Sequence, residues 1–199
     1  MVALGVFAKP PQPGLVKTRL IPAIGATGAA RIYRYCLDHA LELAHHSGLD
    51  YQLYLSQHSD DALFQAEQYT VQKGADLGGR MLHALEDMIS RFHDGAIIIG
   101  SDCLDMNIGH LQAAAQALAN HELVLQPTED GGYALIGCTR AQPELFRNVA
   151  WSSGQVLAQT LSNAERLNYR VSLLETVRDI DTLQDVEQYP ELLTLITSA

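Results

Sequence analysis

Short apolar runs alternate along the chain with longer stretches in which apolar residues recur at helical spacing. Short runs bounded by glycine, proline or polar residues are typical of buried strands, whereas a spacing of three to four residues is typical of helices. The runs predict strands at residues 2–8, 51–56, 96–100, 122–126, 133–138 and 170–175, and a short extended segment at Val71. The helical spacing predicts helices at 29–46 behind a cap at Thr27, and at 60–68, 78–92, 108–119, 153–167 and 182–196, the last broken near Pro190.

The order of these elements indicates the fold class. Strands alternate with helices over most of the chain, which predicts a three-layer α/β/α sandwich with a mainly parallel sheet. The run at 96–100 (AIIIG) is apolar throughout, as in a central parallel strand that is covered on both faces. No repeat, low-complexity tract or interdomain linker interrupts the pattern, so we expect residues 1–199 to form one domain.

Composition narrows the classes of partner. The chain has 199 residues, of which 47% are hydrophobic and 18% charged, which is typical of a globular protein. Its net charge of −10 provides no bulk attraction to nucleic acid or anionic lipid. No apolar run approaches the roughly 18 residues of a membrane span, and the apolar start at 1–8 lacks the basic flank and length of a secretory signal. The three widely spaced cysteines, Cys36, Cys103 and Cys138, suit a reducing compartment. We therefore expect a cytoplasmic protein that binds neither nucleic acid nor membrane.

Positive charge is concentrated at the start of the chain. Residues 1–37 contain five basic residues and no acidic one, a charge of +5, whereas the other 162 residues contain 8 basic and 23 acidic residues, a charge of −15. Lys9, Lys17, Thr18 and Arg19 lie in the Pro- and Gly-rich loop at 9–21 that follows the first predicted strand. Such charges can form a solvated surface, but their position at a strand end favours an anion site.

Carboxylates follow the later strands. Asp102 comes after the strand at 96–100, Asp130 after that at 122–126, and Asp179 and Asp181 after that at 170–175. In a parallel sheet, ligands bind outside the carboxyl ends of the strands. Lysine and arginine bind phosphate oxygens, and Mg²⁺ takes one or two carboxylates together with phosphate oxygens and water. The combination indicates a site for a nucleotide di- or triphosphate with its metal, although an aspartate after a strand can also be only a turn former or helix cap.

Sharper motifs are incomplete. Residues 14–18 (GLVKT) end like a phosphate-binding P-loop but lack its first glycine and the glycine before the lysine. Ser101 lacks the second glycine of a hydrolase nucleophile elbow, and no histidine is placed beside Cys103 by sequence, so a buried thiol is expected there. Trp151 is expected to pack at an edge of the core, although its position before a predicted helix allows it to face a cleft.

Six blocks in order resemble one known family over nearly the whole chain. They are residues 7–20 (FAKPPQPGLVKTRL), 76–81 (DLGGRM), 100–103 (GSDC), 129–133 (EDGGY), 151–153 (WSS) and 179–182 (DIDT). The family comprises bacterial transferases named for their occurrence beside radical-SAM and selenium-associated domains. The resemblance implies the nucleotide-diphospho-sugar transferase (GT-A) fold, within which the chain is similar to phospholactate guanylyltransferase and, more distantly, to molybdenum-cofactor guanylyltransferase.

The resemblance implies roles for individual residues. Lys17 and Arg19 match the basic loop that holds nucleotide phosphates, Asp102 matches the metal-binding aspartate, and Asp181 matches a second carboxylate near the metal. Leu104 departs from the family, which commonly has proline there, and this alters the turn after Asp102.

Further positions match the family less directly. Asp76, Gly78 and Arg80 fall where relatives contact base or ribose. Asp130 lies in a matching block and is a candidate catalytic residue without an assigned role.

These observations predict a transferase that depends on Mg²⁺ or Mn²⁺. In the first hypothesis it is a nucleotidyltransferase: Lys17 and Arg19 hold the β- and γ-phosphates of a nucleoside triphosphate, Asp102 and Asp181 hold the metal, and a small phosphorylated acceptor displaces pyrophosphate. Since the acceptor phosphate is already ionised, no base is required. In the second it is a glycosyltransferase that uses a nucleotide sugar, with Asp130 or Asp179 as the base. In the third it is a nucleotide-binding module without catalysis. A homodimer is compatible with each.

Overall fold

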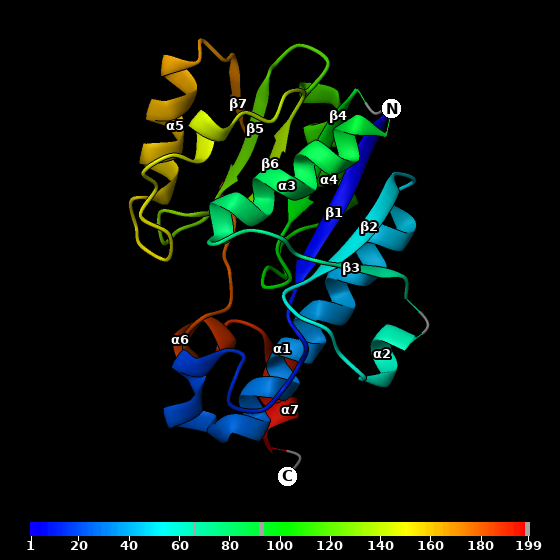
Figure 1. The fold of residues 1–199 in the computed structure, drawn as a ribbon. Helices are drawn as coiled ribbons and strands as arrows, with labels where there is room; N and C mark the ends of the chain where they lie inside the picture. The colour runs from blue at the N-terminus through cyan, green and yellow to red at the C-terminus, as the bar shows by residue number, and fades with distance from the viewer. Residues whose placement is uncertain (66, 92–93, 198–199) are drawn as a thin grey trace.

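Seven strands of the described residues form one mixed sheet in the order β3-β2-β1-β4-β6-β5-β7 (Figure 1). The structure is a computed structural model that describes residues 1–65, 67–91 and 94–197. The strands are β1 (Val2–Ala8), β2 (Asp50–Leu55), β3 (Tyr69–Val71), β4 (Gly95–Ile99), β5 (Leu123–Pro127), β6 (Tyr133–Cys138) and β7 (Val171–Leu173). All of the pairings are parallel except those of β6, which runs antiparallel to both β4 and β5. The sheet is therefore mainly parallel, as predicted.

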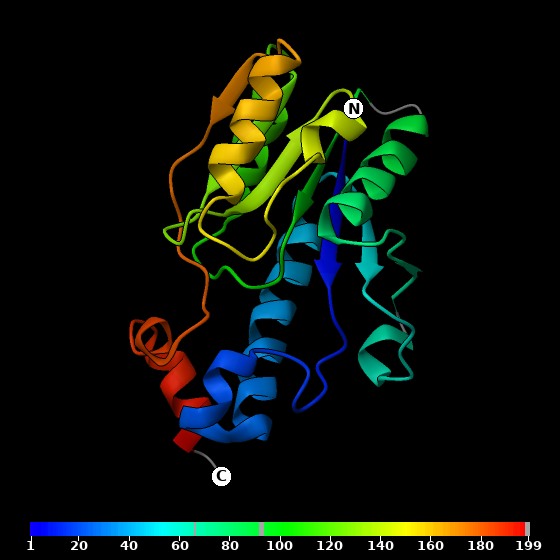
Figure 2. The same ribbon diagram turned by 60° about the vertical axis from the view of Figure 1, so that its left-hand side comes forward.

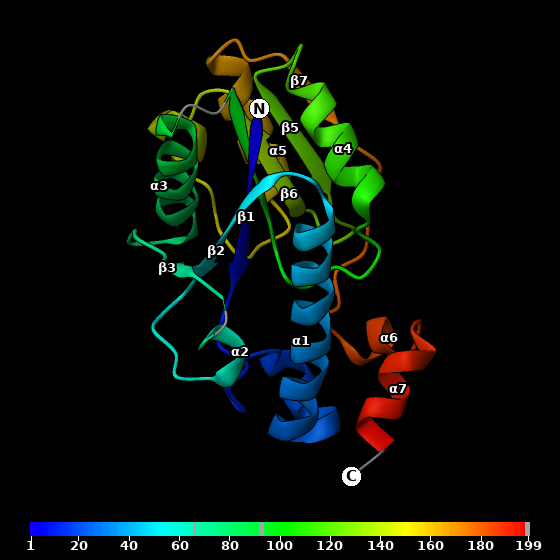
Figure 3. The same cartoon turned by 90° about the vertical axis from the view of Figure 1, so that its right-hand side faces the viewer.

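Helices cover both faces of this sheet (Figure 3). Their bounds are α1 (Ile21–His46), α2 (Ala62–Gln65), α3 (Leu77–Ser90), α4 (Ile108–Ala117), α5 (Val156–Arg166), α6 (Leu183–Val186) and α7 (Pro190–Thr197), with 3-10 turns η1 (Thr18–Leu20) and η2 (Pro143–Phe146). Side chains of α1 and α4 belong to the core on one face, and side chains of α3 and α5 belong to the core on the other. The predicted three-layer α/β/α architecture is confirmed.

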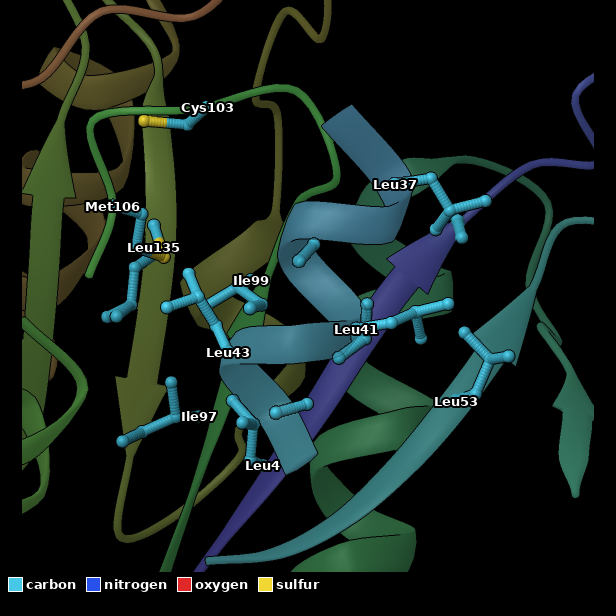
Figure 4. Close-up of a cluster of buried hydrophobic side chains, with 14 of the residues drawn as sticks. Leu4, Leu37, Leu41, Leu43, Leu53, Ile97, Ile99, Cys103, Met106 and Leu135 are labelled. Atoms are coloured by element: carbon cyan, nitrogen blue, oxygen red, sulfur yellow. The ribbon is translucent and has the colours of Figure 1, made fainter. Parts of the chain in front are cut away.

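The central strand β4 explains why the two cores form. All five of its residues are buried, and alternate side chains point to opposite faces: Ile97 and Ile99 lie in the core under α1, and Ala96 and Ile98 lie in the core under α3. Figure 4 shows Leu37, Leu41 and Leu43 of α1 packed over strand side chains of the first core. A continuous apolar run is what a strand covered on both faces requires.

A small third core lies beyond the carboxyl ends of the strands. It joins η1 and the first part of α1 to α6 and α7, which lie together below the sheet in Figures 1 and 2. Its fully buried members include Leu20, Ile180 and Leu192. This packing anchors both the basic loop before α1 and the carboxylate-bearing segment before α6.

Several element boundaries differ from the sequence prediction. The first long helix begins at Ile21 instead of residue 29, and it contains a kink at Gly25 (φ 72°, ψ 164°). Pro22 lies in its first turn, where the missing N–H costs nothing. The helix expected at 60–68 is one turn, α2, and Ala66 lies outside the described residues. The helix expected to end at Phe92, also outside the described residues, is helical to Ser90. The final helix is divided into α6 and α7, with Pro190 starting the second.

Candidate functional site

A cleft of about 610 Å³ opens at the carboxyl ends of the parallel strands. Of the site residues predicted from the sequence, eight line it: Lys9, Lys17, Thr18, Arg19, Arg80, Asp102, Asp130 and Asp181. Asp179 and Trp151 line it as well. The sheet thus brings together segments that are far apart in the chain, because the loops after parallel strands meet at one edge.

Lys17 is a deeply buried charged group of the cleft. Its side chain is only 2% exposed, and its Nζ lies 2.8 Å from Asp102 Oδ1 and 3.2 Å from Asp181 Oδ1. Burial acts to lower the pKa of the ammonium, but the charges of Asp102 and Asp181 outweigh it, so the pKa lies above its ordinary value. The lysine therefore stays charged and links the carboxylate after β4 to the one that precedes α6.

The backbone holds Lys17 in this position. Its neighbours Val16 and Leu20 are buried in the cores, which fixes the chain on both sides of it. Lys17 itself has left-handed backbone angles (φ 47°, ψ 44°), which are uncommon for a residue with a side chain. Such a conformation costs about 1–3 kcal/mol and persists where the surroundings enforce it, often at functional sites.

Arg19 completes the pairing of Asp181. Its Nη1 lies 3.0 Å from Asp181 Oδ2, but its side chain is 62% exposed, so this contact is at the rim of the cleft. The Asp181 segment is joined to the Asp102 loop because the Ile180 N–H donates to the Asp102 carbonyl at 2.9 Å. Two carboxylates and two cations therefore form one compact cluster, which we call the inner cluster: Lys17, Arg19, Asp102 and Asp181.

Asp130 and Asp179 both line the cleft as well. The Asp130 carboxylate accepts hydrogen bonds from Thr128 Oγ1 at 2.6 Å and from the Gly132 N–H at 2.9 Å. Burial, and then the negative charges of Asp130 and Asp181, raise the pKa of Asp179 to about 6. Asp179 thus has the pKa of a group that can exchange a proton near neutral pH.

The turn that carries Asp130 is built for close approach. Gly131 has φ 86°, and a Cβ at this position would lie 2.4 Å from the carbonyl oxygen of Gly154. Only glycine fits there, and the contact brings the loop at 129–132 against the loop at 151–154. Trp151 is placed in the cleft by that second loop.

Not every predicted residue reaches the cleft. Asp76 is exposed and caps α3, with the Gly79 N–H donating to its Oδ1 at 2.8 Å. Gly78 is buried, and a Cβ there would lie 2.5 Å from Trp151 Cζ2, so the glycine allows the indole to pack on α3. Arg80 does line the cleft, and its Nε is buried without a hydrogen-bond partner among the described residues.

Sequence reasoning assigned no role in the site to four polar residues of the cleft, which lie on α1 and after β2, β3 and β4. Tyr33 OH accepts from the Lys9 N–H at 2.7 Å and lies 3.0 Å from Ser101 Oγ, which fixes the turns after β1 and β4. Gln72 donates from Nε2 to the Tyr54 and Ala8 carbonyls at 3.0 and 3.4 Å. Tyr33, Ser101 and Gln72 all line the cleft, as does Ser56. For Gln72 the sequence did contain a signal, because this residue comes directly after the extended segment predicted at Val71.

The inner cluster can be tested for its fit to a divalent metal. Asp102 and Asp181 converge on one nitrogen within 3.2 Å, and all their donor atoms are hard oxygens, which suit Mg²⁺ or Mn²⁺. Among the described residues no group of three or more His, Cys, Asp or Glu side chains is arranged to hold a metal. Two carboxylates with phosphate oxygens and water are nevertheless a usual Mg²⁺ site. The residues therefore fit a metal that arrives with a phosphate ligand.

A comparison with family models identifies the family. The model described as "Uncharacterized protein conserved in bacteria (DUF2064)" matches residues 37–153, more than half of the chain, and the chain belongs to this family. The match includes Asp102 and Asp130, whereas Lys17 and Asp181 lie outside it. No curated protein matches the chain in sequence.

Solved structures share the fold. A Desulfovibrio desulfuricans G20 protein, provisionally assigned as a nucleotide-diphospho-sugar transferase, is 27% identical with a TM-score of 0.89, over 99% of this chain and 97% of that one. A nucleotidyl transferase from Methanothermobacter thermautotroptrophicus has a TM-score of 0.62 at 11% identity, over 100% and 99% of the two chains. The CMP:2-keto-3-deoxy-manno-octonic acid synthetase, solved with CTP, has a TM-score of 0.57 at 11% identity, over 97% and 98%. The fold is therefore that of the nucleotide-diphospho-sugar transferases, and its structural neighbours include nucleotidyltransferases.

One neighbour holds a metal. Rv0371c from Mycobacterium tuberculosis H37Rv, solved in complex with manganese, has a TM-score of 0.54 at 17% identity, over 97% of each chain.

In the present structure no helix of the described residues has the length and apolar character needed to cross a membrane.

Proposed function

We propose that this protein is a metal-dependent nucleotidyltransferase that moves a nucleoside monophosphate from a nucleoside triphosphate to a small phosphorylated acceptor, releasing pyrophosphate. The observation that carries the proposal is the inner cluster, where Lys17 and Arg19 meet Asp102 and Asp181 at the carboxyl edge of the sheet. Cations for phosphate and carboxylates for a metal lie within one cleft. The nucleotidyl transferase and the CTP-binding synthetase among the structural neighbours support the same class of substrate.

The finer resemblance supports a narrower version of this proposal. The six sequence blocks resemble the transferases found beside radical-SAM and selenium-associated domains, and the block at 17–20 (KTRL) is similar to phospholactate guanylyltransferase. On that basis the acceptor is a small phosphorylated acid.

Each residue of the inner cluster has a defined task in this reaction. Lys17 and Arg19 bind oxygens of the β- and γ-phosphates, which neutralises charge that builds up on the departing pyrophosphate. Asp102 and Asp181 would hold the divalent ion, which when bound draws electron density from the phosphate oxygens and orients them. The acceptor phosphate is already ionised, so the protein needs to align it and no side chain has to remove a proton.

A specific observation keeps glycosyl transfer as the second candidate. Asp179 lines the cleft and its pKa is raised to about 6, so it can accept a proton from an acceptor hydroxyl near neutral pH. The similar protein from Desulfovibrio desulfuricans is provisionally assigned to the nucleotide-diphospho-sugar transferases. In this reaction a nucleoside diphosphate leaves instead of pyrophosphate.

The leaving group separates the two candidates. Purified protein would be incubated with Mg²⁺ or Mn²⁺, a panel of phosphorylated acids and sugars, and each nucleoside triphosphate, and pyrophosphate would be measured. Parallel reactions would contain nucleotide sugars and hydroxyl acceptors, and nucleoside diphosphate would be measured. We expect metal-dependent pyrophosphate release that Asp102→Asn lowers by about 10²–10³-fold. Release of nucleoside diphosphate alone would establish the second candidate, and nucleotide binding without either product would indicate a non-catalytic module.

A further inference from the structure

The inner cluster is already neutralised before any ligand arrives. Of the four carboxylate oxygens of Asp102 and Asp181, three contact cations: Lys17 Nζ lies 2.8 Å from Asp102 Oδ1 and 3.2 Å from Asp181 Oδ1, and Arg19 Nη1 lies 3.0 Å from Asp181 Oδ2. Two positive and two negative charges cancel locally. The pair of carboxylates that would hold a metal therefore exerts little net attraction on a free divalent cation.

Lys17 also occupies the position between the two carboxylates. A single ammonium nitrogen within 3.2 Å of both Oδ1 atoms stands where a shared cation would have to bind. Its side chain is 2% exposed, whereas those of Asp102 and Asp181 are 45% and 34% exposed, so the charge attraction is stronger than in a fully exposed ion pair. A divalent ion can bind to both carboxylates only if Lys17 leaves one or both.

We propose that Lys17 is a resident cation that keeps free divalent metal out of the Asp102–Asp181 site, so that the site takes metal only together with a nucleoside triphosphate. This inference rests on the proposed function, because it assumes that the cleft binds triphosphates. A triphosphate offers its own anionic oxygens to Lys17 and Arg19. As these cations turn to the phosphates, the two carboxylates are released for the metal that the triphosphate brings.

The side chains suit such an exchange. Lysine carries a compact charge on a flexible four-carbon stem, so its nitrogen can move between neighbouring anions without movement of its backbone. The backbone of Lys17 is held by the buried Val16 and Leu20 on its two sides. Arg19 is exposed at the rim, where an approaching phosphate meets it before Lys17. The arrangement therefore links release of the carboxylates to arrival of the anion.

Manganese binding tests this without any turnover. Free Mn²⁺ would be measured by electron paramagnetic resonance during titration of wild type, Lys17→Met and Lys73→Met in about 0.1 M salt without nucleotide. Lys73 is an exposed lysine that does not line the cleft, so it is the matched control for loss of one positive charge. We expect Lys17→Met to bind Mn²⁺ at least about tenfold more tightly than wild type, and Lys73→Met to match wild type. A non-hydrolysable triphosphate should tighten Mn²⁺ binding to wild type by about tenfold or more beyond the binding of Mn²⁺ to the triphosphate alone.

Two results would overturn the proposal. In the first, wild type binds Mn²⁺ without nucleotide as tightly as Lys17→Met does. In the second, Lys17→Met binds Mn²⁺ no more tightly than Lys73→Met does. Circular dichroism checks that each variant is folded. If Lys17→Met does not fold, wild type alone decides: Mn²⁺ binding without nucleotide that is as tight as binding with the non-hydrolysable triphosphate then overturns the proposal. A tighter Lys17→Met site in a protein that never releases pyrophosphate would refute the proposed function while leaving the exclusion of metal by Lys17 in place.

Discussion

Two charged clusters share the loops that follow β4 and β7, and only one of them lines the cleft. The inner cluster faces the cleft and contains Lys17, Arg19, Asp102 and Asp181. The second, which we call the outer cluster, consists of Arg178, Glu129, Asp105 and Tyr189. Arg178 binds Glu129 with two hydrogen bonds, of 2.9 and 3.1 Å, and its N–H donates to Asp105 Oδ2 at 3.2 Å. Tyr189 OH donates to Asp105 Oδ1 at 2.6 Å.

The two clusters differ in burial, in backbone conformation and in whether they line the cleft. The outer cluster is a closed set of exposed pairs, in which each carboxylate is bound by an arginine or tyrosine of the same chain. The inner cluster contains a buried lysine with a left-handed backbone and lines a cleft of about 610 Å³. Exposed pairs contribute about 0–1 kcal/mol and chiefly fix geometry. Charge alone therefore does not mark a site in this protein, whereas burial, backbone strain and an open cleft together do.

The largest expected effect comes from Asp102→Asn. The amide keeps the shape of the side chain but removes the charge that attracts Lys17 and, in the proposed reaction, the metal. We expect metal-dependent turnover to fall about 10²–10³-fold, or about 3–4 kcal/mol of transition-state stabilisation. Asp105→Asn in the outer cluster, three residues further on, is the control and should keep turnover within a few fold. Equal losses in the two variants would show that the comparison of the clusters is wrong.

Lys17→Met should weaken triphosphate binding by about 10- to 100-fold, because a charge-assisted contact is worth about 1.5–3 kcal/mol. Binding of the nucleoside should change little. Arg19→Met should weaken triphosphate binding less, since its exposed side chain is screened by water and salt. Calorimetric titration measures the affinity of each protein for the triphosphate, the diphosphate and the nucleoside. Equal weakening for every ligand would indicate a collapsed loop and not a lost phosphate contact.

Asp181→Ala should reduce metal affinity in the presence of triphosphate by about tenfold while leaving metal-free triphosphate binding nearly intact. The reason is that Asp181 is, in the proposed reaction, the second carboxylate that holds the metal. It shares Lys17 with Asp102 and also contacts Arg19. Mn²⁺ titration with a non-hydrolysable triphosphate measures the change. Asp179→Ala is the comparison variant, and a larger loss in that protein would move the second metal ligand from Asp181 to Asp179.

The sequence predicts much of this site because parallel strands place their carboxyl ends at one edge. Lys17, Asp102 and Asp181 follow different strands. The sheet order brings the carboxylates of Asp102 and Asp181 within 3.2 Å of Lys17 Nζ. The burial of Lys17 between Asp102 and Asp181 could not be predicted, because these partners lie far away along the chain. Such long-range contacts leave no local pattern in the sequence.

Two local patterns in the sequence indicate features that were not predicted. Asp76 directly precedes a helix, which is typical of a capping residue. The connection between β5 and β6, at 128–132, is too short for a crossover helix and so requires an antiparallel pair. Gly78 could not be assigned in this way, since only the folded structure shows Trp151 lying against it.

A smaller effect is expected on the pH dependence of stability, through the titration of Asp179. Its pKa is raised to about 6 in the folded protein, by burial first and then by Asp130 and Asp181. The folded state therefore binds more protons than the unfolded state between about pH 4 and pH 6, and stability falls as pH rises through that range. Asp179→Asn removes this titration, so it should be more stable than wild type by about 1 kcal/mol at pH 7.5 and similar to it at pH 4. The carboxyl is partly exposed, so solvent screening limits the effect. Urea unfolding at both pH values measures it, and parallel curves for the two proteins would contradict the expectation.

The smallest expected effect is that of breaking the outer cluster at Arg178. Arg178→Met removes two hydrogen bonds to Glu129 but keeps the backbone N–H that binds Asp105. Because the pair is exposed, the free energy of unfolding should fall by about 1 kcal/mol or less. Triphosphate affinity and Mn²⁺ affinity should stay within about twofold of wild type, since the inner cluster is held independently by the Ile180–Asp102 backbone hydrogen bond and by burial of Ile180. Urea unfolding and calorimetric titration on the same preparation test both statements. A loss of metal affinity as large as that in Asp181→Ala would mean that the two clusters act as one network through Arg178, and that the outer pairs help to set the geometry of the inner site.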